Sequence, residues 1–257
     1  MSLSENPIQI SFVIPAYNEE ALIGKCLASI ERELADSPYV AEIIVVNNAS
    51  TDRTRVVAES FANVRVVDEL VKGLPRARQA GFLASRGKLV ANVDADAMLT
   101  PGWINVVIEE FAKQPVLVGL SGPCIYYDLP PFSRFIYHTL YSFGFFLYLL
   151  NHHVFGMCTP LQGGNFVLRR SALEQVGGYD TSILFFGEDV DIAKRMDKTG
   201  LVKWTPRLSM YASGRRISAQ GISVTLWNYA VSYMSVTFIG KSFQDTYTAI
   251  RNSHHST

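Results

Sequence analysis

The sequence contains few cysteines and no excess of charge of either sign. Three cysteines occur in 257 residues, far apart at Cys26, Cys124 and Cys158, and none belongs to a CxxC pattern. This spacing argues against a disulfide framework and against a zinc site, and it fits a reducing compartment. Basic and acidic residues number 23 each, so no excess positive field exists to hold a phosphate backbone. We therefore expect no nucleic-acid partner.

Long apolar runs are also missing. No stretch of 18 or more uninterrupted apolar residues occurs, which argues against a clear membrane-spanning helix. The first residues, Met1 to Gln9, are polar and lack the basic and apolar regions of a secretory signal. These absences predict a cytoplasmic protein. The hydrophobic content of 48% over this length is enough for one substantial core, alone or with a subdomain.

Strand-like and helix-like segments alternate over the first 120 residues. The predicted strands cover residues 8–14, 42–46, 64–67, 88–93 and 116–120, and amphipathic helical patterns lie between them. The connections are too long for hairpins, so the pattern predicts βαβ units and a mostly parallel sheet. After Pro123 the alternation stops. Further strands are predicted at 166–169 and 201–204, with a long apolar helix over 218–251.

The most informative stretch is the strand Lys88 to Val93, which leads into Asp94 and Asp96. If the extended geometry continues to Asp96, both carboxylates point to one side. Ligands usually bind at such strand ends in α/β sheets, and two hard oxygen ligands suit a divalent cation and, through it, a diphosphate. The alternative is that these acids only end a strand before the Thr100-Pro101-Gly102 turn.

Other polar turns are expected at the same edge of the sheet. The turn Pro15-Ala16-Tyr17-Asn18-Glu19 follows the first strand, and Asn47-Asn48 follows the second. A tyrosine face, amides and helix N-termini suit a nucleotide base and ribose. Each turn alone is weak evidence, because Asn and Pro are common turn residues. Their occurrence at successive strand ends is the stronger indication.

Further charged candidates lie outside these turns. Glu188 and Asp189 open a helix behind Gly187, where the helix dipole favours ionised carboxylates; acids in a first turn also serve stability alone. Arg78, and Arg215 with Arg216 beside Gly214, are candidates for neutralising a departing diphosphate.

The segment 132–155 is dense in aromatic residues but carries Arg134 and His138. One interpretation is an amphipathic helix in a membrane surface; the other is a surface packed on the sheet or at a homodimer interface. We favour membrane contact because a second aromatic-rich region runs from Leu226 to Phe238.

Six motifs follow one another between about Ile10 and Trp204. They are VIPAYNEE (Val13–Glu20), VVNNASTDRT (Val45–Thr54), GLPRARQAG (Gly73–Gly81), VDAD (Val93–Asp96), LQGGNFVLRRSALEQVGGYD (Leu161–Asp180) and GEDVDIAKR (Gly187–Arg195). In this order and spacing they resemble the family 2 glycosyltransferases of the GT-A fold, which are inverting enzymes that use nucleotide-sugars. The resemblance covers most of the chain.

The resemblance implies roles for individual residues. It assigns nucleotide-sugar contacts to Pro15, Ala16, Tyr17, Glu19, Asn48, Arg78, Asp94, Ala95, Asp96, Arg215 and Arg216. It assigns acceptor contacts to Gly163, Gly164 and Asn165, and catalytic roles to Asp189 as general base and its neighbour Glu188.

Three positions depart from the family pattern. Asn48 stands where many members carry an acid that contacts the base, which leaves the identity of the base open. Gln79 replaces the usual Asn after the family's arginine, which Arg78 matches. Met98 replaces a further metal ligand found in some members, so the resemblance gives Mg²⁺ or Mn²⁺ two protein ligands, Asp96 directly and Asp94.

The predicted organisation is a GT-A catalytic domain over residues 1–217 and a C-terminal helical segment with a polar tail over 218–257. The domain divides into a nucleotide-binding half (8–122) and an acceptor half (123–217), the latter with an aromatic insert at 130–156 for membrane contact.

The predicted function is transfer of a sugar from a UDP- or GDP-sugar to a hydroxyl acceptor, lipid-linked or an envelope glycan, by metal-assisted in-line displacement. The protein would act in the cytoplasm, with peripheral contact to the inner face of the membrane as one alternative. A sugar nucleotidyltransferase and a non-catalytic membrane-associated nucleotide-binding module are the competing functions.

Overall fold

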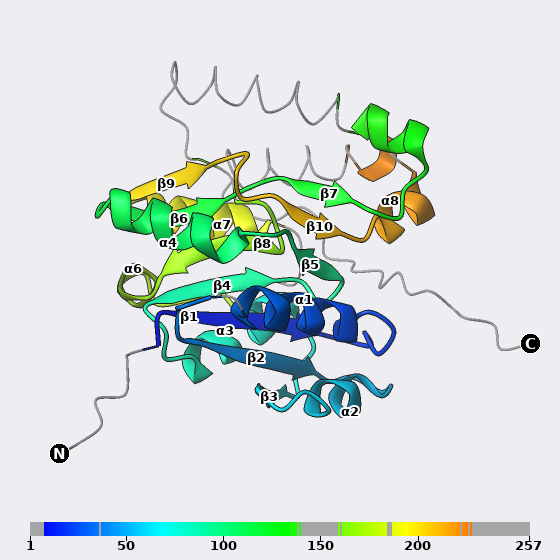
Figure 1. The fold of residues 1–257 in the computed structure, drawn as a ribbon, viewed down its shortest axis with the longest axis horizontal. Helices are drawn as coiled ribbons and strands as arrows, with labels where there is room; N and C mark the ends of the chain where they lie inside the picture. The colour runs from blue at the N-terminus through cyan, green and yellow to red at the C-terminus, as the bar shows by residue number, and fades with distance from the viewer. Residues whose placement is uncertain are drawn as a thin grey trace, which may run out of the picture.

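A computed structural model describes residues 8–35, 37–137, 139, 159, 161–183, 187–221, 223–225 and 227. Its centre is a seven-stranded sheet between two layers of helices (Figure 1). In spatial order the strands are β3 (Val64–Glu69), β2 (Ala41–Asn48), β1 (Ile10–Ala16), β4 (Leu89–Val93), β8 (Asn165–Arg169), β6 (Leu117–Ser121) and β9 (Leu201–Trp204).

The sheet is mostly parallel. β3, β2, β1 and β4 pair in parallel, and β6 pairs in parallel with β9. Only β8 is antiparallel to its two neighbours, β4 and β6, among the strands that the structure describes in this sheet. The predicted α/β class with a mostly parallel central sheet is confirmed. The carboxyl ends of β1, β2 and β4 therefore lie along one edge.

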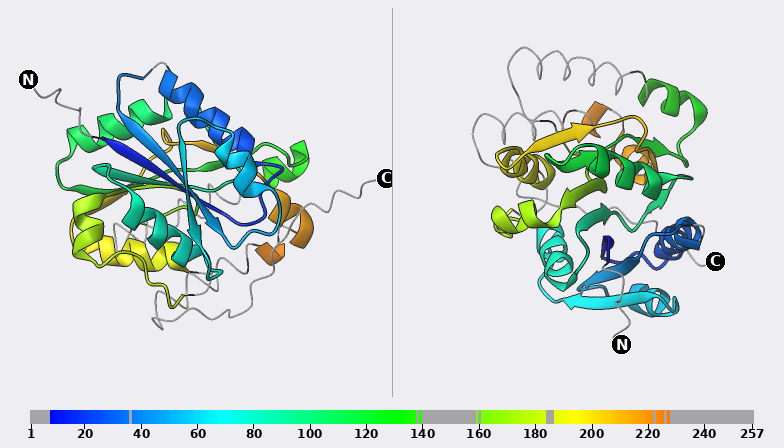
Figure 2. Two further views of the ribbon diagram at one scale, coloured as in Figure 1. Left: turned by 90° about the horizontal axis from the view of Figure 1, so that it is seen from below. Right: turned by 60° about the vertical axis from the view of Figure 1, so that its left-hand side comes forward.

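Helices cover both faces of the sheet, as the left view of Figure 2 shows. One face packs against α1 (Ile23–Ala35), α2 (Thr54–Glu59) and α4 (Trp103–Lys113). The other packs against α3 (Leu74–Ala84), α6 (Arg170–Gln175) and α7 (Glu188–Asp197). The inner strands are therefore apolar on both sides, as expected for a parallel sheet.

Helix α3 lies unusually close to the sheet because of Gly81. A Cβ atom at this position would lie 2.2 Å from Val13 Cγ1 and 3.0 Å from Val46 Cγ2. Residues three apart share a helix face, so the same contact turns Arg78 toward the interior. This local packing decides where Arg78 lies in the site.

A second sheet extends the first beyond the carboxyl end of β4. It pairs β5 (Ala97–Leu99), β10 (Met210–Ala212) and β7 (Cys124–Tyr126), and it leads to α8 (Arg215–Gln220). A small core of Tyr126, Tyr137 and Ile217 joins β7, the helical segment 131–137 and α8. These elements bring the C-terminal part of the chain to the strand ends of the first sheet.

The predicted strands of the large sheet are confirmed with small changes of boundary. The three strands of the small sheet were not predicted, because each has only three residues and no period can be seen over that length. Arg215 and Arg216, beside Gly214, lie in the first turn of α8, a short helix that the sequence did not predict. Most of the predicted helix over 218–251 and of the segment 132–155 lies outside the described residues.

Candidate active site

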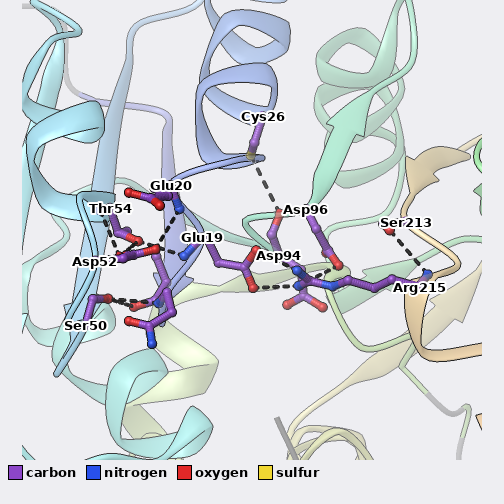
Figure 3. A network of polar contacts seen from close by, with 12 residues as sticks. Glu19, Glu20, Cys26, Ser50, Asp52, Thr54, Asp94, Asp96, Ser213 and Arg215 are labelled. Atoms are coloured by element: carbon purple, nitrogen blue, oxygen red, sulfur yellow. Dashed lines mark hydrogen bonds and ion pairs between the residues drawn. The ribbon is translucent and has the colours of Figure 1, made fainter. Parts of the chain in front are cut away.

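Two turns at the ends of β1 and β2 hold each other in place (Figure 3). The backbone N–H of Asn18 donates to Ser50 Oγ at 3.1 Å, and that of Glu19 donates to Thr54 Oγ1 at 2.7 Å. Thr51 N–H donates to Asn18 Oδ1 at 2.8 Å. Asn18 has φ +53°, a left-handed conformation that Asn tolerates better than most residues. This network fixes the direction in which Tyr17 and Glu19 leave the sheet.

Asn48, predicted to contact the base, is used inside the fold. Its amide nitrogen donates to the carbonyls of Glu69 and Val71, and its amide oxygen accepts from Gly73 N–H at 2.8 Å. Only 4% of the residue is exposed. Asn48 therefore fixes the β3–α3 loop. That loop carries Lys72, whose Nζ lies 3.8 Å from the centre of the Tyr17 ring.

Strand β4 ends at Val93, and a turn carries Asp94 to Asp96. Ala97 N–H donates to Asp94 O at 3.0 Å, which closes the turn. The assumption that the extended geometry continues to Asp96 is wrong. The two carboxylates instead have different partners: Asp94 pairs with Arg78 and Asp96 with Arg215. Ala95 between them is buried.

Arg215 reaches the site from α8 and joins two acids from distant parts of the chain (Figure 3). Its guanidinium donates to both oxygens of Glu19, at 2.8 and 2.5 Å, and lies 3.0 Å from Asp96 Oδ2. Burial raises the pKa of Asp96 to about 7, although Arg215 opposes the rise. Asp128, which the sequence did not single out, accepts hydrogen bonds from Ser213 Oγ and Gly214 N–H. It therefore fixes the two residues that precede Arg215.

A second arginine, Arg78, lies on the inner side of the same turn. It is 1% exposed and donates to Glu188 Oε1 at the start of α7. Its other terminal nitrogen donates to Asp94 Oδ1 at 3.3 Å. Arg78 was predicted to contact the donor and Glu188 to take part in catalysis. In the structure these two residues pair with each other inside the protein.

Asp189 follows Glu188 on α7, whose first turn is entered through Gly187 at φ +85°. Its Oδ1 accepts from Val190 N–H at 2.9 Å, and burial raises its pKa while Arg78 opposes the rise. A Cβ at Gly163 would lie 3.5 Å from Asp189 Oδ2, and a Cβ at Gly164 would lie 2.3 Å from Asp94 Oδ2. The diglycine backbone therefore lies against both carboxylates and brings them into one site.

Asn165, predicted to contact the acceptor, is completely buried. Its amide nitrogen donates to the carbonyls of Gly122 and Leu208, at 3.1 and 2.8 Å, and its amide oxygen accepts from Trp103 Nε1 at 3.2 Å. Its side chain thus holds the two sheets together and is not available to an acceptor. Neighbouring Gly163 and Gly164 remain predicted acceptor contacts through their backbone.

The remaining predicted residues lie near the same edge. Pro15 and Ala16 end β1 beside Tyr17, and Arg216 follows Arg215 on α8. Sequence reasoning missed Asp128, because a single acid in an irregular segment has no motif around it. No feature of the sequence around Asp128 indicates its role.

The donor atoms of the site fit a divalent cation that also binds an anionic ligand. Asp94 and Asp96 offer carboxylate oxygens within one turn, and the Arg215 guanidinium already places positive charge against Asp96. No group of three or more His, Cys, Asp or Glu side chains arranged to hold a metal is found among the described residues. The protein ligands alone therefore make an incomplete set, which diphosphate oxygens could complete.

An α/β sheet with a carboxylate cluster at its strand ends defines a protein that binds ligands at that edge. The comparison with known families then identifies it. Residues 11–177 match the family model described as Glycosyl transferase family 2, and the chain belongs to this family.

Curated relatives match a shorter part of the chain. A dolichyl-phosphate β-glucosyltransferase (ALG5D) of Trichomonas vaginalis is 39% identical over 99 residues, which are 35% of this chain and 30% of that protein. A dodecaprenyl-phosphate galacturonate synthase of Rhizobium johnstonii is 31% identical over 121 residues, 44% of this chain and 36% of that protein. The matched part thus spans about a third of these relatives.

Solved structures share the fold at low identity. The Pyrobaculum calidifontis mannosyltransferase PcManGT, solved with GDP-Man and Mn²⁺, has a TM-score of 0.66 and 20% identity and covers 93% of this chain and 66% of its own. Glucosyl-3-phosphoglycerate synthase from Mycobacterium tuberculosis, with Mn²⁺ and UDP-glucose, has a TM-score of 0.57 and 20% identity, with coverage of 88% and 78%. The expected GT-A fold is confirmed.

Among the described residues, no helix combines the length and the apolar character that a membrane crossing requires.

Proposed function

We propose that this protein is an inverting glycosyltransferase that moves a sugar from a nucleotide-diphosphate-sugar to a hydroxyl acceptor. One observation carries the proposal. The diglycine Gly163–Gly164 lies against Asp94 at the end of β4 and against Asp189 at the start of α7, so a cation-binding acid and a candidate base share one site. Family membership supports glycosyl transfer over the nucleotidyltransferase and non-catalytic alternatives.

The donor is proposed to be a UDP- or GDP-sugar. Two proteins of the same fold were solved with GDP-Man and with UDP-glucose, each with Mn²⁺, which supports both the donor class and a divalent cation. Tyr17 offers a ring for the base to stack on, at the end of β1. Because the Asn48 amide is used within the fold, base selection falls to other groups near Tyr17 and Lys72.

Asp96, with Asp94, would hold the cation, as Mg²⁺ or Mn²⁺. Such a cation would neutralise charge on the diphosphate when the glycosidic bond breaks. Arg215 already pairs with Asp96 and Glu19, so a cation and Arg215 compete for the Asp96 carboxylate. Released from Asp96, the Arg215 guanidinium would be available to the diphosphate, with Arg216 beside it. This would make Arg215 a phosphate ligand only in the loaded site.

In the chemical step, Asp189 accepts the proton of the acceptor hydroxyl. The acceptor oxygen then bonds to the anomeric carbon from the face opposite the diphosphate, and the bond from that carbon to the diphosphate oxygen breaks. The nucleoside diphosphate leaves with the bonding electrons, and the anomeric centre inverts. The two glycines keep side chains out of the space between the acids, which leaves room for both substrates.

The acceptor is proposed to be lipid-linked, with the protein peripheral on the cytoplasmic face of a membrane. Two relatives are named for transfer involving dolichyl phosphate or dodecaprenyl phosphate. Exposed aromatic side chains support a surface contact near the site: Phe132 is 75% exposed, Phe135 69% and Trp227 70%. The homodimer alternative for 132–155 predicts that the same side chains meet a second copy.

Asp189→Asn tests the base. Purified protein would be screened for transfer from UDP- and GDP-sugars with Mn²⁺, and the product anomer read by NMR. We expect at least a hundredfold loss of turnover in the variant, with unchanged nucleotide binding, because general bases contribute about 10²–10⁴-fold. Asp191→Asn on the same helix is the control, since Asp191 pairs with Arg195. Near-normal turnover of Asp189→Asn, or a retained anomer, would contradict the proposal.

Liposome flotation tests the surface contact. Wild-type protein is expected to float with vesicles of anionic lipid, and Phe132→Ser/Phe135→Ser is expected to remain below. If wild type does not float and the variant dissociates a dimer in sedimentation, the homodimer alternative is correct.

A further inference from the structure

We propose that Arg78 is a positioning residue that joins the base-bearing helix α7 to the metal-binding turn after β4, and that it does not contact the donor. The inference rests on the proposed function, because it assigns those two elements the base and the cation. It replaces the donor contact that the family pattern suggested for this arginine.

Arg78 is surrounded by protein. The residue is 1% exposed, and its guanidinium carbon lies 4.9 Å from the centre of the Phe166 ring. One terminal nitrogen donates to Glu188, which is itself 6% exposed, and the other donates to Asp94. Both terminal nitrogens of the guanidinium therefore have carboxylate partners on different elements, and little surface remains for a ligand to reach.

The two partners of Arg78 lie next to different functional groups: Glu188 precedes the proposed base Asp189, and Asp94 lies in the turn of the proposed cation ligand Asp96. Glu188 is the residue before Asp189, and fixing Glu188 in the interior fixes the direction of the next side chain on α7. Asp94 lies between Arg78 on one side and the backbone of Gly164 on the other. One planar, rigid fork thus sets the separation of Asp189 and the turn that carries Asp96.

Charge supports the same role. Three acids, Glu188, Asp189 and Asp94, act on Arg78 and raise its pKa against the effect of burial, so the guanidinium stays charged. Burial raises the pKa of Glu188, and Arg78 is the main group that opposes the rise. Without Arg78, the pKa values of Glu188 and Asp189 would rise further, because both acids would lose the cation that opposes the effect of burial. No group would then join α7 to the turn after β4.

The test separates positioning from donor binding and from general stability. Arg78→Met is expected to unfold easily, because it leaves the buried Glu188 carboxyl unpaired. Arg78→Met/Glu188→Met replaces the buried pair by apolar side chains and is expected to recover thermal stability. Arg78→Lys keeps the charge but cannot bond both carboxylates as a fork. Arg169→Met is the control, since Arg169 stacks 5.3 Å from the centre of the Phe111 ring and donates to Leu117 O on β6 and not to α3.

Three measurements would be made on each folded variant. These are the Kd for nucleotide-sugar with Mn²⁺ by calorimetry, kcat at saturating donor, and hydrogen exchange of backbone amides. The proposal expects Arg78→Lys and the double variant to keep Kd within about threefold and to lose at least about thirtyfold in kcat. It also expects faster exchange at both Val190–Asp191 and Asp96–Ala97, with the rest of α7 unchanged. Arg169→Met should show none of these effects.

Two results would overturn the inference. A tenfold or larger rise in Kd with kcat retained would make Arg78 a donor ligand. Recovery of kcat together with stability in the double variant would make its role structural only. If wild-type protein transfers no sugar, the proposed function fails; hydrogen exchange still decides the inference, because coupled loosening of the two distant segments does not depend on turnover.

Discussion

The site contains two arginine centres that use the same chemistry in different surroundings. In the inner centre, Arg78 pairs with Glu188 and Asp94, and its side chain is 1% exposed. In the outer centre, Arg215 pairs with Glu19 and Asp96, and its side chain is 16% exposed. Each joins two acids from elements far apart in sequence, and each supplies one positive charge between them. They differ in whether water and a ligand can replace the arginine.

The difference in exposure implies different roles for Arg78 and Arg215. The buried Arg78 guanidinium costs a large free energy to move, because it would leave Glu188, whose side chain is 6% exposed, unpaired in a low dielectric. A guanidinium at the edge of the site can exchange its partner for water or for a phosphate at small cost. We therefore interpret the inner centre as fixed and the outer centre as exchangeable.

The largest expected difference is in stability. Arg78→Met should lower the free energy of unfolding by about 3–5 kcal/mol, since it breaks a buried pair by removing one partner. Arg215→Met should lower it by about 1–2 kcal/mol, because the Arg215 side chain is itself partly exposed and water can replace it at Asp96, while Glu19 stays buried. Urea unfolding followed by circular dichroism measures both. Equal losses would show that the two centres are equally fixed and would break the comparison.

The next difference concerns the cation. Because Arg215 occupies the Asp96 carboxylate, Arg215→Gln should tighten Mn²⁺ binding in the absence of nucleotide by about fivefold, equivalent to about 1 kcal/mol. The same variant should bind nucleotide-sugar more weakly, since it removes a diphosphate ligand. Mn²⁺ titration followed by electron paramagnetic resonance gives the first value and calorimetry the second.

Arg207→Gln is the control for that titration. It removes the same charge from Arg207, which pairs with Glu109 and Glu110 on α4 and not with Asp96. Its Mn²⁺ affinity should stay within roughly twofold of wild type. If both variants tighten Mn²⁺ alike, the effect is one of net charge, and Arg215 does not compete for the cation.

For these two centres, the sequence predicted which residues belong to the site but not which residues pair with each other. The strand pattern and the motifs located Asp94, Asp96, Glu188 and Asp189, because local composition determines strand ends and helix starts. The motifs also indicated Arg78, and the two arginines beside Gly214 indicated Arg215. The partners of these arginines could not be predicted, since each pair joins segments about 16 to 196 residues apart in the chain. Only the packing of α3 on Val13 through Gly81 shows that Arg78 faces inward.

The burial of Asn48 and Asn165 could not be predicted from the sequence for a related reason. Both are amides at the end or start of a buried strand, where backbone carbonyls of neighbouring loops converge. An amide side chain there can satisfy carbonyls that would otherwise be unpaired, and this need is invisible in a one-dimensional pattern. Family motifs name such positions without distinguishing structural use from ligand contact.

The smallest expected difference is in the pH dependence of kcat. Asp189 must be ionised to accept a proton, so activity falls as pH drops through its pKa in the loaded enzyme. Burial raises this pKa, Asp94 raises it further, and Arg78 lowers it. Removing the Arg78 charge therefore raises the pKa and moves the acidic limb to higher pH, while Arg78→Lys, which keeps the charge, moves it less. Arg215 does not act on Asp189 in this way, so Arg215→Gln should leave the limb in place. Assays of kcat from pH 4 to 9 on Arg78→Met/Glu188→Met, Arg78→Lys and Arg215→Gln measure the position of the acidic limb. An equal shift in all three variants would mean that both arginines affect the Asp189 pKa alike, and that the two centres are not electrostatically separate.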